Sequence, residues 1–148
     1  MTEVGSATAE DVQAVVETFQ AARQAAMPWL PRLHSDEEDR RYFAERVIGE
    51  CDVFVVRRDA VPVAFMALRN DLVEHLYVRP EVQRTGIGSA LLEVAKSRRR
   101  QGLRLWVFQR NHAARAFYAR RGFTEVRFTD GADNEEHEPD VLLAWAGR

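Results

Sequence analysis

The stretch from Leu72 to Lys96 most constrains what this chain can fold into. It begins with an apolar-rich segment, Leu72–Val78, that is typical of a strand, and continues through a proline-containing turn, Arg79–Thr85. Gly86-Ile87-Gly88 then opens a segment whose apolar residues recur at helical spacing. A strand, a glycine turn and a helix start together predict an anion site. The first N–H groups of a helix have no partner inside it, and the helix dipole places partial positive charge there.

The glycine pattern of this turn excludes two familiar phosphate sites. A dinucleotide-binding fingerprint needs G-x-G-x-x-G, whereas the pattern here is Gln83-x-x-Gly86-x-Gly88 with no third glycine at that spacing. A Walker loop needs G-K-[ST], whereas Gly88 is followed by Ser89-Ala90. A Gln-x-x-Gly-x-Gly turn remains, directly after a strand that ends in Leu76-Tyr77-Val78.

Length and composition limit the number of domains, the cellular compartment and the kinds of partner that we expect. A chain of 148 residues predicts a single domain over 1–148 that buries about 70% of its unfolded surface. Without a bilayer-length apolar run or a signal-like N-terminus, we expect a cytoplasmic protein with no membrane partner. The lone Cys51 fits a reducing compartment. A net charge of −2 argues against a nucleic-acid partner, and four scattered histidines with one cysteine predict no metal site.

The order of periodic segments predicts an α+β, or mixed α/β, fold. Ser35 and Glu38 form a capping-box pattern at the start of the second helix. The expected helices lie over about 8–26, 35–49, 87–98 and 111–122, and the expected strands over 52–58, 61–69, 72–78, 103–109, 123–129 and 141–146. About four helices would therefore flank a mostly antiparallel sheet of about six to seven strands. The last strand, Val141–Trp145, offers an edge for pairing across a homodimer.

A second block, from Asn111 to Phe123, resembles the signature N-x-x-A/R-x-x-F-Y-x-x-x-G-F of the GNAT N-acetyltransferase superfamily. The turn Gln83–Ser89 resembles the acetyl-CoA-binding motif of the same family, and the resemblance extends over the whole order of elements. It implies a sheet that splays between its fourth and fifth strands, with the co-substrate acetyl-CoA in the gap. It also implies an acyltransferase that moves an acetyl group directly to a primary amine. A non-catalytic acyl-CoA sensor is the alternative.

The resemblance also implies roles for particular residues. The N–H groups of Arg84–Ser89 would meet the pyrophosphate, Asn111 the pantetheine arm, and the Val78 N–H the developing oxyanion. Tyr118 would protonate the leaving thiolate, since a tyrosine hydroxyl titrates near pH 10. The Arg84 side chain, where the family often has glycine, either contacts phosphate or is a solvated charge. The residues expected to bind the cofactor are Leu76, Tyr77, Val78, Gln83, Arg84, Thr85, Gly86, Ile87, Gly88, Ser89, Asn111 and Tyr118.

The acceptor amine needs a base, because an alkyl amine is mostly protonated at pH 7. Strand alternation predicts that Glu74 shares one face with Leu76 and Val78, so that its carboxylate accepts the proton through a water. His75 would face the other way. Other candidates for the base are His34, Glu135, Glu136 and His137, each with an alternative as a surface polar residue.

The segment Asp130–Asp140 is an acidic loop between the last two strands, and the family places this hairpin beside the acceptor. An acidic rim would attract a cationic amine, such as a polyamine, an amino sugar or a basic peptide terminus. A solvated loop is the alternative. The residues expected to contact the acceptor are Trp29, His34, Glu135 and Glu136.

Overall fold

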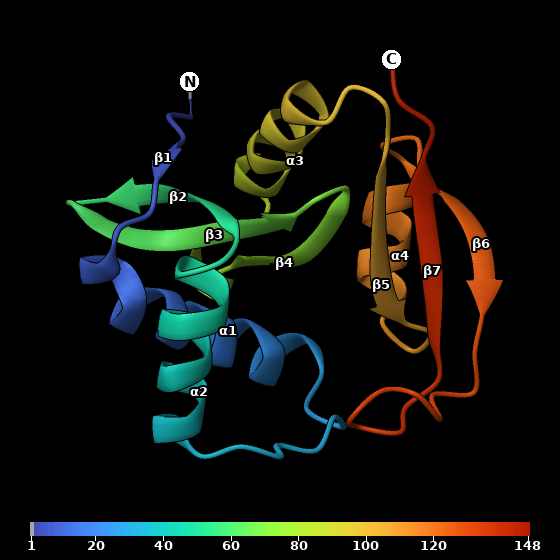
Figure 1. Cartoon of the computed structure of the whole chain (residues 1–148), viewed down its shortest axis with the longest axis horizontal. Coiled ribbons are helices and arrows are strands. Elements are labelled where there is room, and N and C mark those ends of the chain that lie inside the picture. Colours follow the sequence, from blue (N-terminus) through green and yellow to red (C-terminus); the bar gives the residue numbers. More distant parts are fainter. Residues whose placement is uncertain (1) are drawn as a thin grey trace.

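The computed structural model describes residues 2–148 (Figure 1). Its strands are β1 Gly5–Ser6, β2 Asp52–Arg58, β3 Val61–Arg69, β4 Leu72–Val78, β5 Leu103–Phe108, β6 Thr124–Phe128 and β7 Asp140–Trp145. Its helices are α1 Val12–Ala26, α2 Asp36–Tyr42, α3 Ile87–Arg98 and α4 His112–Ala119, with shorter turns η1 Ala9–Asp11, η2 Phe43–Ile48 and η3 Pro80–Val82. No helix within residues 2–148 is long and apolar enough to cross a membrane.

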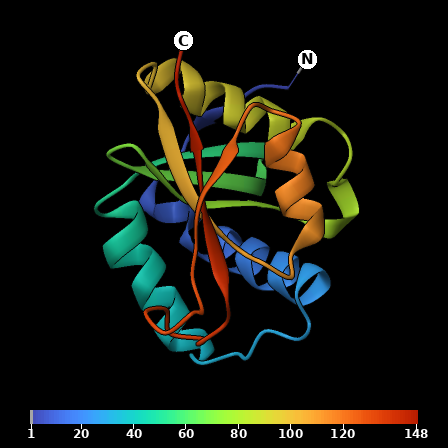
Figure 2. The same cartoon turned by 90° about the vertical axis from the view of Figure 1, so that its right-hand side faces the viewer.

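The seven strands found in residues 2–148 form one sheet in the order β1-β2-β3-β4-β5-β7-β6. Neighbouring strands are antiparallel except β4 and β5, which run parallel and, within the described chain, are in register only at Leu72 and Arg104. Beyond that pair the two strands diverge, so β5, β7 and β6 run across the direction of β2–β4 (Figure 2). The predicted α+β fold and the splay between the fourth and fifth strands are confirmed.

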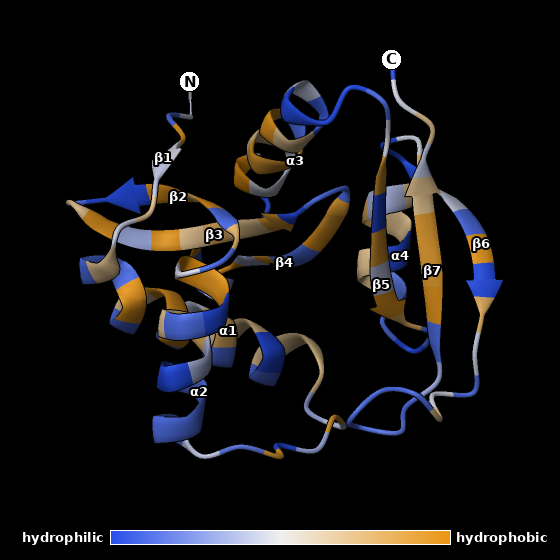
Figure 3. Cartoon of the chain, viewed as in Figure 1, coloured by the Kyte–Doolittle hydropathy of each residue, from blue (hydrophilic) through white to orange (hydrophobic). Residues whose placement is uncertain are grey.

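Two apolar clusters hold the helices against the sheet. One packs α1 and η2 on β2 and β3 and includes the fully buried Phe43 and Phe65. The other packs α3 and α4 on the opposite face and includes Leu91, Leu105 and Tyr118. Figure 3 shows hydrophobic colours along much of β3 and β7 and hydrophilic colours on the outer turns of α2. Helices therefore cover both faces of the sheet. This packing holds β4 and β5 in place where the two strands diverge.

Local side-chain chemistry fixes the helix starts that the sequence predicts. At α2, the Glu38 N–H donates to Ser35 Oγ at 3.1 Å, and the Ser35 N–H donates to Glu38 Oε1 at 2.8 Å. At α4, the Ala114 N–H donates to Asn111 Oδ1 at 3.2 Å. At α3, Gly86 precedes the first turn with φ of 86°, a conformation that favours glycine.

The prediction that Glu74 shares a face with Leu76 and Val78 is wrong because β4 contains a β-bulge. Ala67 pairs with His75 and Leu68 with Val73, which leaves Glu74 without a partner on β3. Val73, Leu76 and Val78 all belong to the core cluster under α3, so Glu74 is out of phase with them. Its carboxylate instead accepts a hydrogen bond from Arg69 Nε at 3.1 Å.

The prediction that the last strand offers a free edge is also wrong. β7 lies between β5 and β6, with antiparallel partners on both sides. The long connection after β6 lets the chain return into the middle of this half of the sheet, so that β7 is buried between two neighbours. The edge strand is β6, in which every residue is exposed.

Candidate active site

The gap between β4 and β5 contains a cavity of about 450 Å³. Its walls are formed by the segment from Val73 to Tyr77 on β4 and the segment from Leu105 to Phe108 on β5. Asn111 and Tyr118 contribute side chains from α4. We call this cavity the cofactor cleft. It exists because two parallel strands that lack a continuous ladder expose backbone groups on their facing edges.

The edge of β4 that faces the cleft carries unpaired backbone donors. The Arg79 N–H donates to the Val63 carbonyl of β3 at 2.9 Å. N–H groups point alternately to either side of a strand, so those of Val78 and Leu76 point away from β3, toward β5. The Val78 carbonyl accepts a hydrogen bond from Gln83 Nε2 at 3.0 Å. Gln83 therefore closes the turn, while the Val78 N–H points toward β5, just beyond the part of β4 that lines the cleft.

The turn before α3, residues 83–89, presents further backbone donors. It does not line the cleft itself, but its Gly88 lies beside the side chains of Val78 and Phe117. Thr85 Oγ1 donates to the Val82 carbonyl at 2.6 Å, and Arg84 adopts a positive φ of 64° beside Gly86. The N–H groups of Ile87 to Ser89 then emerge from the first turn of a helix of 12 residues. These donors, with the dipole of α3 behind them, suit an anion.

Tyr118 contributes a buried hydroxyl to the lining of the cleft. Its ring packs against Phe117 and Phe123 at centroid distances of 5.1 and 5.4 Å, and the residue is 8% exposed. Burial, and to a smaller extent the hydroxyl of Tyr77, raise the pKa of Tyr118, whereas the charge of Arg121 lowers it. The hydroxyl is therefore protonated at pH 7 and able to donate.

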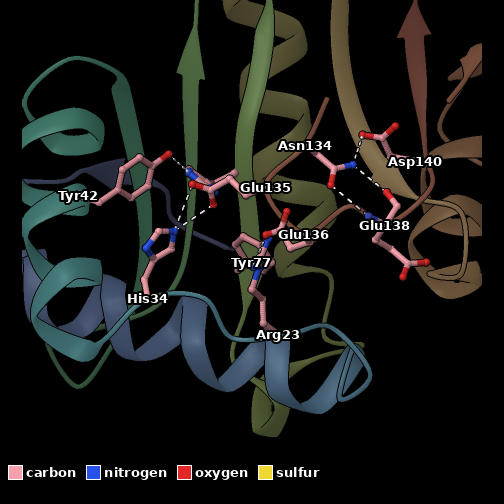
Figure 4. Close-up of polar contacts among 10 residues, drawn as sticks. Arg23, His34, Tyr42, Tyr77, Asn134, Glu135, Glu136, Glu138 and Asp140 are labelled. Atoms are coloured by element: carbon pink, nitrogen blue, oxygen red, sulfur yellow. Dashed lines mark hydrogen bonds and ion pairs between the residues drawn. The ribbon is translucent and has the colours of Figure 1, made fainter. Parts of the chain in front are cut away.

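A second cavity, of about 790 Å³, lies between α1, α2 and the loop that precedes β7. We call it the acceptor cavity. His34 Nε2 lies 3.0 Å from Glu135 Oε2, and Arg23 Nη1 lies 3.4 Å from Glu136 Oε2 (Figure 4). Arg23 Nε also donates to the Tyr77 hydroxyl at 3.3 Å. Segments far apart in the sequence thus meet across this cavity through ion pairs.

The predicted acceptor residues do not all gather in one place. His34, Glu135 and Glu136 line the acceptor cavity. Trp29 lies apart, edge-on to Phe108 at 6.2 Å, with the guanidinium of Arg110 4.0 Å from its ring centroid. No pattern in the proline-rich loop indicates which way this ring points.

The acidic loop before β7 is largely paired with cations of the same chain. Beyond the two pairs already described, Glu138 accepts two hydrogen bonds from Arg110, at 3.0 and 2.9 Å. Asp140 accepts from Thr129 Oγ1 and from Asn134 Nδ2. His137 lies at the loop's turn, with a φ of 52°. Hydrogen bonds and ion pairs to the rest of the chain therefore hold this charged loop in place.

The two cavities share Arg23, Met27 and His75 as lining residues. His75 Nε2 lies 3.0 Å from the Tyr42 hydroxyl. Burial, and then the charge of Arg23, lower the pKa of His75 to about 3, so the imidazole is neutral at pH 7. Burial raises the pKa of Tyr42 to about 12. The sequence did not indicate these residues, because contacts between α1, α2 and β4 carry no local motif.

Comparison with known proteins identifies the family. The family model for the GNAT acetyltransferase domain matches residues 39–125, more than half of the chain. The apo-form of YjaB from Escherichia coli is 23% identical, with a TM-score of 0.79 over 100% of this chain and 99% of that one. The ribosomal-protein-S18-alanine N-acetyltransferase from Escherichia coli is 23% identical, with a TM-score of 0.75 over 100% and 96%.

The PaiA N-acetyltransferase from Thermoplasma acidophilum, solved in complex with coenzyme A, is 18% identical, with a TM-score of 0.73 over 99% of both chains. At these identities the structural likeness shows a shared fold. The family model matches more than half of the chain, and this match shows membership of the family in addition to the fold. With this match, the chain belongs to the GNAT acetyltransferase family and is an acyltransferase.

Proposed function

We propose that this protein transfers the acetyl group of acetyl-CoA directly to a primary amine. One observation carries the proposal. The β4 edge with its unpaired N–H groups and the Tyr118 hydroxyl face one cleft, which meets the acceptor cavity at Arg23 and His75. The solved neighbour that holds coenzyme A supports the choice of cofactor. A thioester in the cleft and an amine in the acceptor cavity would therefore meet at this junction.

On the cofactor side, the N–H groups from Arg84 to Ser89 hold the pyrophosphate and the Asn111 side chain bonds the pantetheine arm. The Val78 N–H donates to the thioester carbonyl oxygen as negative charge develops there. The amine nitrogen bonds to the carbonyl carbon, and the carbon–sulfur bond breaks. Tyr118 then gives its proton to the departing sulfur. No covalent intermediate with the protein is required.

On the acceptor side, we propose a cationic amine, either a small molecule or a basic peptide terminus. The carboxylates that line the acceptor cavity are Glu17, Glu38, Asp39, Glu135 and Glu136, and its guanidinium groups are Arg23, Arg32 and Arg79. This excess of acids favours a cation. The neighbour named for acetylating an alanine of a ribosomal protein supports a peptide amine as one option. We propose Glu74, which lines the cofactor cleft and is held by Arg69, as the base that acts through a water.

The experiment that tests the activity is release of free thiol from acetyl-CoA with a panel of cationic, neutral and acidic primary amines, basic peptides included. A control without acceptor subtracts the constant signal of Cys51. We expect turnover with cationic amines and little with acidic ones. Absence of turnover across the panel, with acetyl-CoA still bound, would contradict the proposed transfer.

The acceptor class is tested by neutralising the two loop carboxylates together. Glu135→Gln with Glu136→Gln should raise KM for a cationic acceptor about three- to tenfold, equivalent to about 0.7–1.4 kcal/mol, with KM for acetyl-CoA unchanged. The matched control is Asp130→Asn, an acid of the same loop that does not line the cavity. An unchanged acceptor KM in the double variant would contradict the proposal that the acceptor is cationic.

A further inference from the structure

Arg121 lies beside the first turn of α3, in a contact that the sequence patterns did not indicate. Its Nε and Nη2 groups donate to Ser89 Oγ at 3.0 and 2.5 Å, and Nη1 donates to the Phe117 carbonyl at 2.9 Å. Its guanidinium carbon lies 3.7 Å from the Phe117 ring centroid, so the group stacks on that ring. Arg121 is thus partly buried and held in place by two neighbouring elements.

No acidic side chain of the described residues neutralises the charge of Arg121. Among residues 2–148, no carboxylate lies within ion-pair distance of it. By contrast, Arg115 of α4 pairs with Glu125 at 2.5 Å, and Arg110, before that helix, pairs with Glu138 at 2.9 Å. A guanidinium that is fixed, partly desolvated and unneutralised favours binding of an anion.

The hydrogen bonds of Arg121 also decide what Ser89 can do. A serine hydroxyl has one hydrogen to donate and two lone pairs that accept. Ser89 Oγ accepts two hydrogen bonds from Arg121, which uses its accepting capacity and leaves its one hydrogen as the group it can offer a ligand. A guanidinium has five N–H donors, and the three contacts described leave two of them available. Arg121 and Ser89 together therefore present donors and positive charge, and no free acceptor.

We propose that Arg121, with the hydroxyl of Ser89, binds a phosphate group of coenzyme A. The inference rests on the proposed acetyl-CoA site at the turn 83–89 and adds to it a side-chain contact from the end of α4. The shared chemistry is a phosphate oxygen that accepts charge-assisted N–H and O–H hydrogen bonds. The pyrophosphate and the ribose 3′-phosphate both offer this chemistry.

The test compares three ligands by calorimetry: acetyl-CoA, acetyl-3′-dephospho-CoA and S-acetyl-pantetheine, which has no phosphate. Arg121→Gln should weaken binding of acetyl-CoA about tenfold and leave that of S-acetyl-pantetheine unchanged. The matched control is Arg120→Gln, the exposed neighbour, which should change each affinity less than about twofold. Arg121→Lys, which keeps the charge and loses the planar fork, should recover part of the affinity.

Each outcome decides the proposal. A loss with acetyl-CoA that disappears with the dephospho ligand assigns the 3′-phosphate, and a loss with both assigns the pyrophosphate. Equal losses with all three ligands, or a change no larger than that of Arg120→Gln, would overturn the proposal in favour of a structural role. Wild-type protein that binds acetyl-CoA without acetylating any amine would contradict the proposed transfer alone. Failure to bind acetyl-CoA at all would overturn both.

Discussion

The cofactor cleft and the acceptor cavity meet at Arg23 and His75, yet different kinds of chemical group line them. The cofactor cleft is lined by β4 and β5, whose facing edges are paired only at Leu72 and Arg104 in the described chain, and Asn111 and Tyr118 add side chains from α4 and its N-cap. The acceptor cavity consists mainly of side chains that reach one another across long sequence separations through ion pairs. The ion pairs imply that pH should affect the acceptor cavity more than the cofactor cleft.

The largest expected effect is at Tyr118, the side chain of the cleft that we propose donates a proton to the departing sulfur. Tyr118→Phe should lower kcat by about 10²-fold or more, because the departing sulfur loses its proton donor. The affinity for acetyl-CoA should stay nearly the same, since the ring remains in the core. Single-turnover rates and acetyl-CoA binding separate the two effects. Tyr42→Phe, on the acceptor side, should leave acetyl-CoA affinity unchanged and serves as the control.

An unchanged kcat in Tyr118→Phe would contradict the proposed proton transfer from this hydroxyl, and it would sharpen the comparison by leaving the cleft more dependent on its backbone donors. A large loss of acetyl-CoA affinity would weaken the comparison, by showing that the hydroxyl helps to hold the cofactor.

The second prediction concerns His75, at the junction of the two cavities. Its pKa is about 3 in the folded protein and about 6.5 in the unfolded chain, so the unfolded chain binds one more proton between these pH values. The free energy of unfolding should therefore fall as pH falls from 6.5 toward 3, by about 1.4 kcal/mol per pH unit from this group. Denaturant unfolding between pH 4 and 7 measures the slope.

His75→Gln should remove that part of the slope, whereas the exposed His112→Gln should retain it. Equal slopes in wild type and His75→Gln would show that the junction is open to solvent and that His75 titrates normally.

A third, smaller effect tests the backbone of the cofactor cleft. Gly86 has a φ of 86°, and no neighbouring atom lies within 4 Å of the position that a Cβ would take, so alanine there meets backbone strain and no clash. Gly86→Ala should destabilise the protein by about 1–2 kcal/mol and weaken acetyl-CoA binding. Gly5→Ala is the matched control, since Gly5 has equal space and no positive φ. Equal melting temperatures in the two variants would contradict the role of the turn's geometry.

The same contrast explains which features the sequence could predict. The turn 83–89 and the block from Asn111 to Tyr118 are local patterns, so their resemblance to the family's motifs was enough to single out Asn111 and Tyr118, which line the cleft. The bulge at Glu74 is a register shift against β3, and no periodicity within β4 indicates it. The placement of β7 between β5 and β6 likewise depends on pairing between distant strands.

On the acceptor side, His34 and Glu135 were predicted as separate candidates, but their pairing depends on how a proline-rich loop crosses to the hairpin. Arg23, His75 and Arg121 carry no motif at all. Their environment is created by packing between α1, β4, α3 and α4, and only the folded chain shows which charges remain unpaired.

The smallest expected effect concerns the exposed pair between His34 and Glu135. The hydrogen bond that His34 donates to the Glu135 carboxylate raises the pKa of His34. The pair therefore stabilises the protein below pH 6.5, and that contribution is lost as pH rises through the folded pKa. Because both side chains are exposed, it should be worth only a few tenths of a kcal/mol. NMR titration should show a His34 pKa above 6.5 in wild type and near 6.5 in Glu135→Gln.

Glu138→Gln, which removes a carboxylate of the same loop paired with Arg110, should leave the His34 titration as in wild type. A His34 pKa that is equal in wild type and Glu135→Gln would show that the loop before β7 does not rest on His34 in solution. The acceptor cavity would then be open on that side, and the contrast with the fixed cofactor cleft would become sharper. A shift in both variants would instead assign the pKa to the summed charge of the acidic loop, since no single partner could account for it.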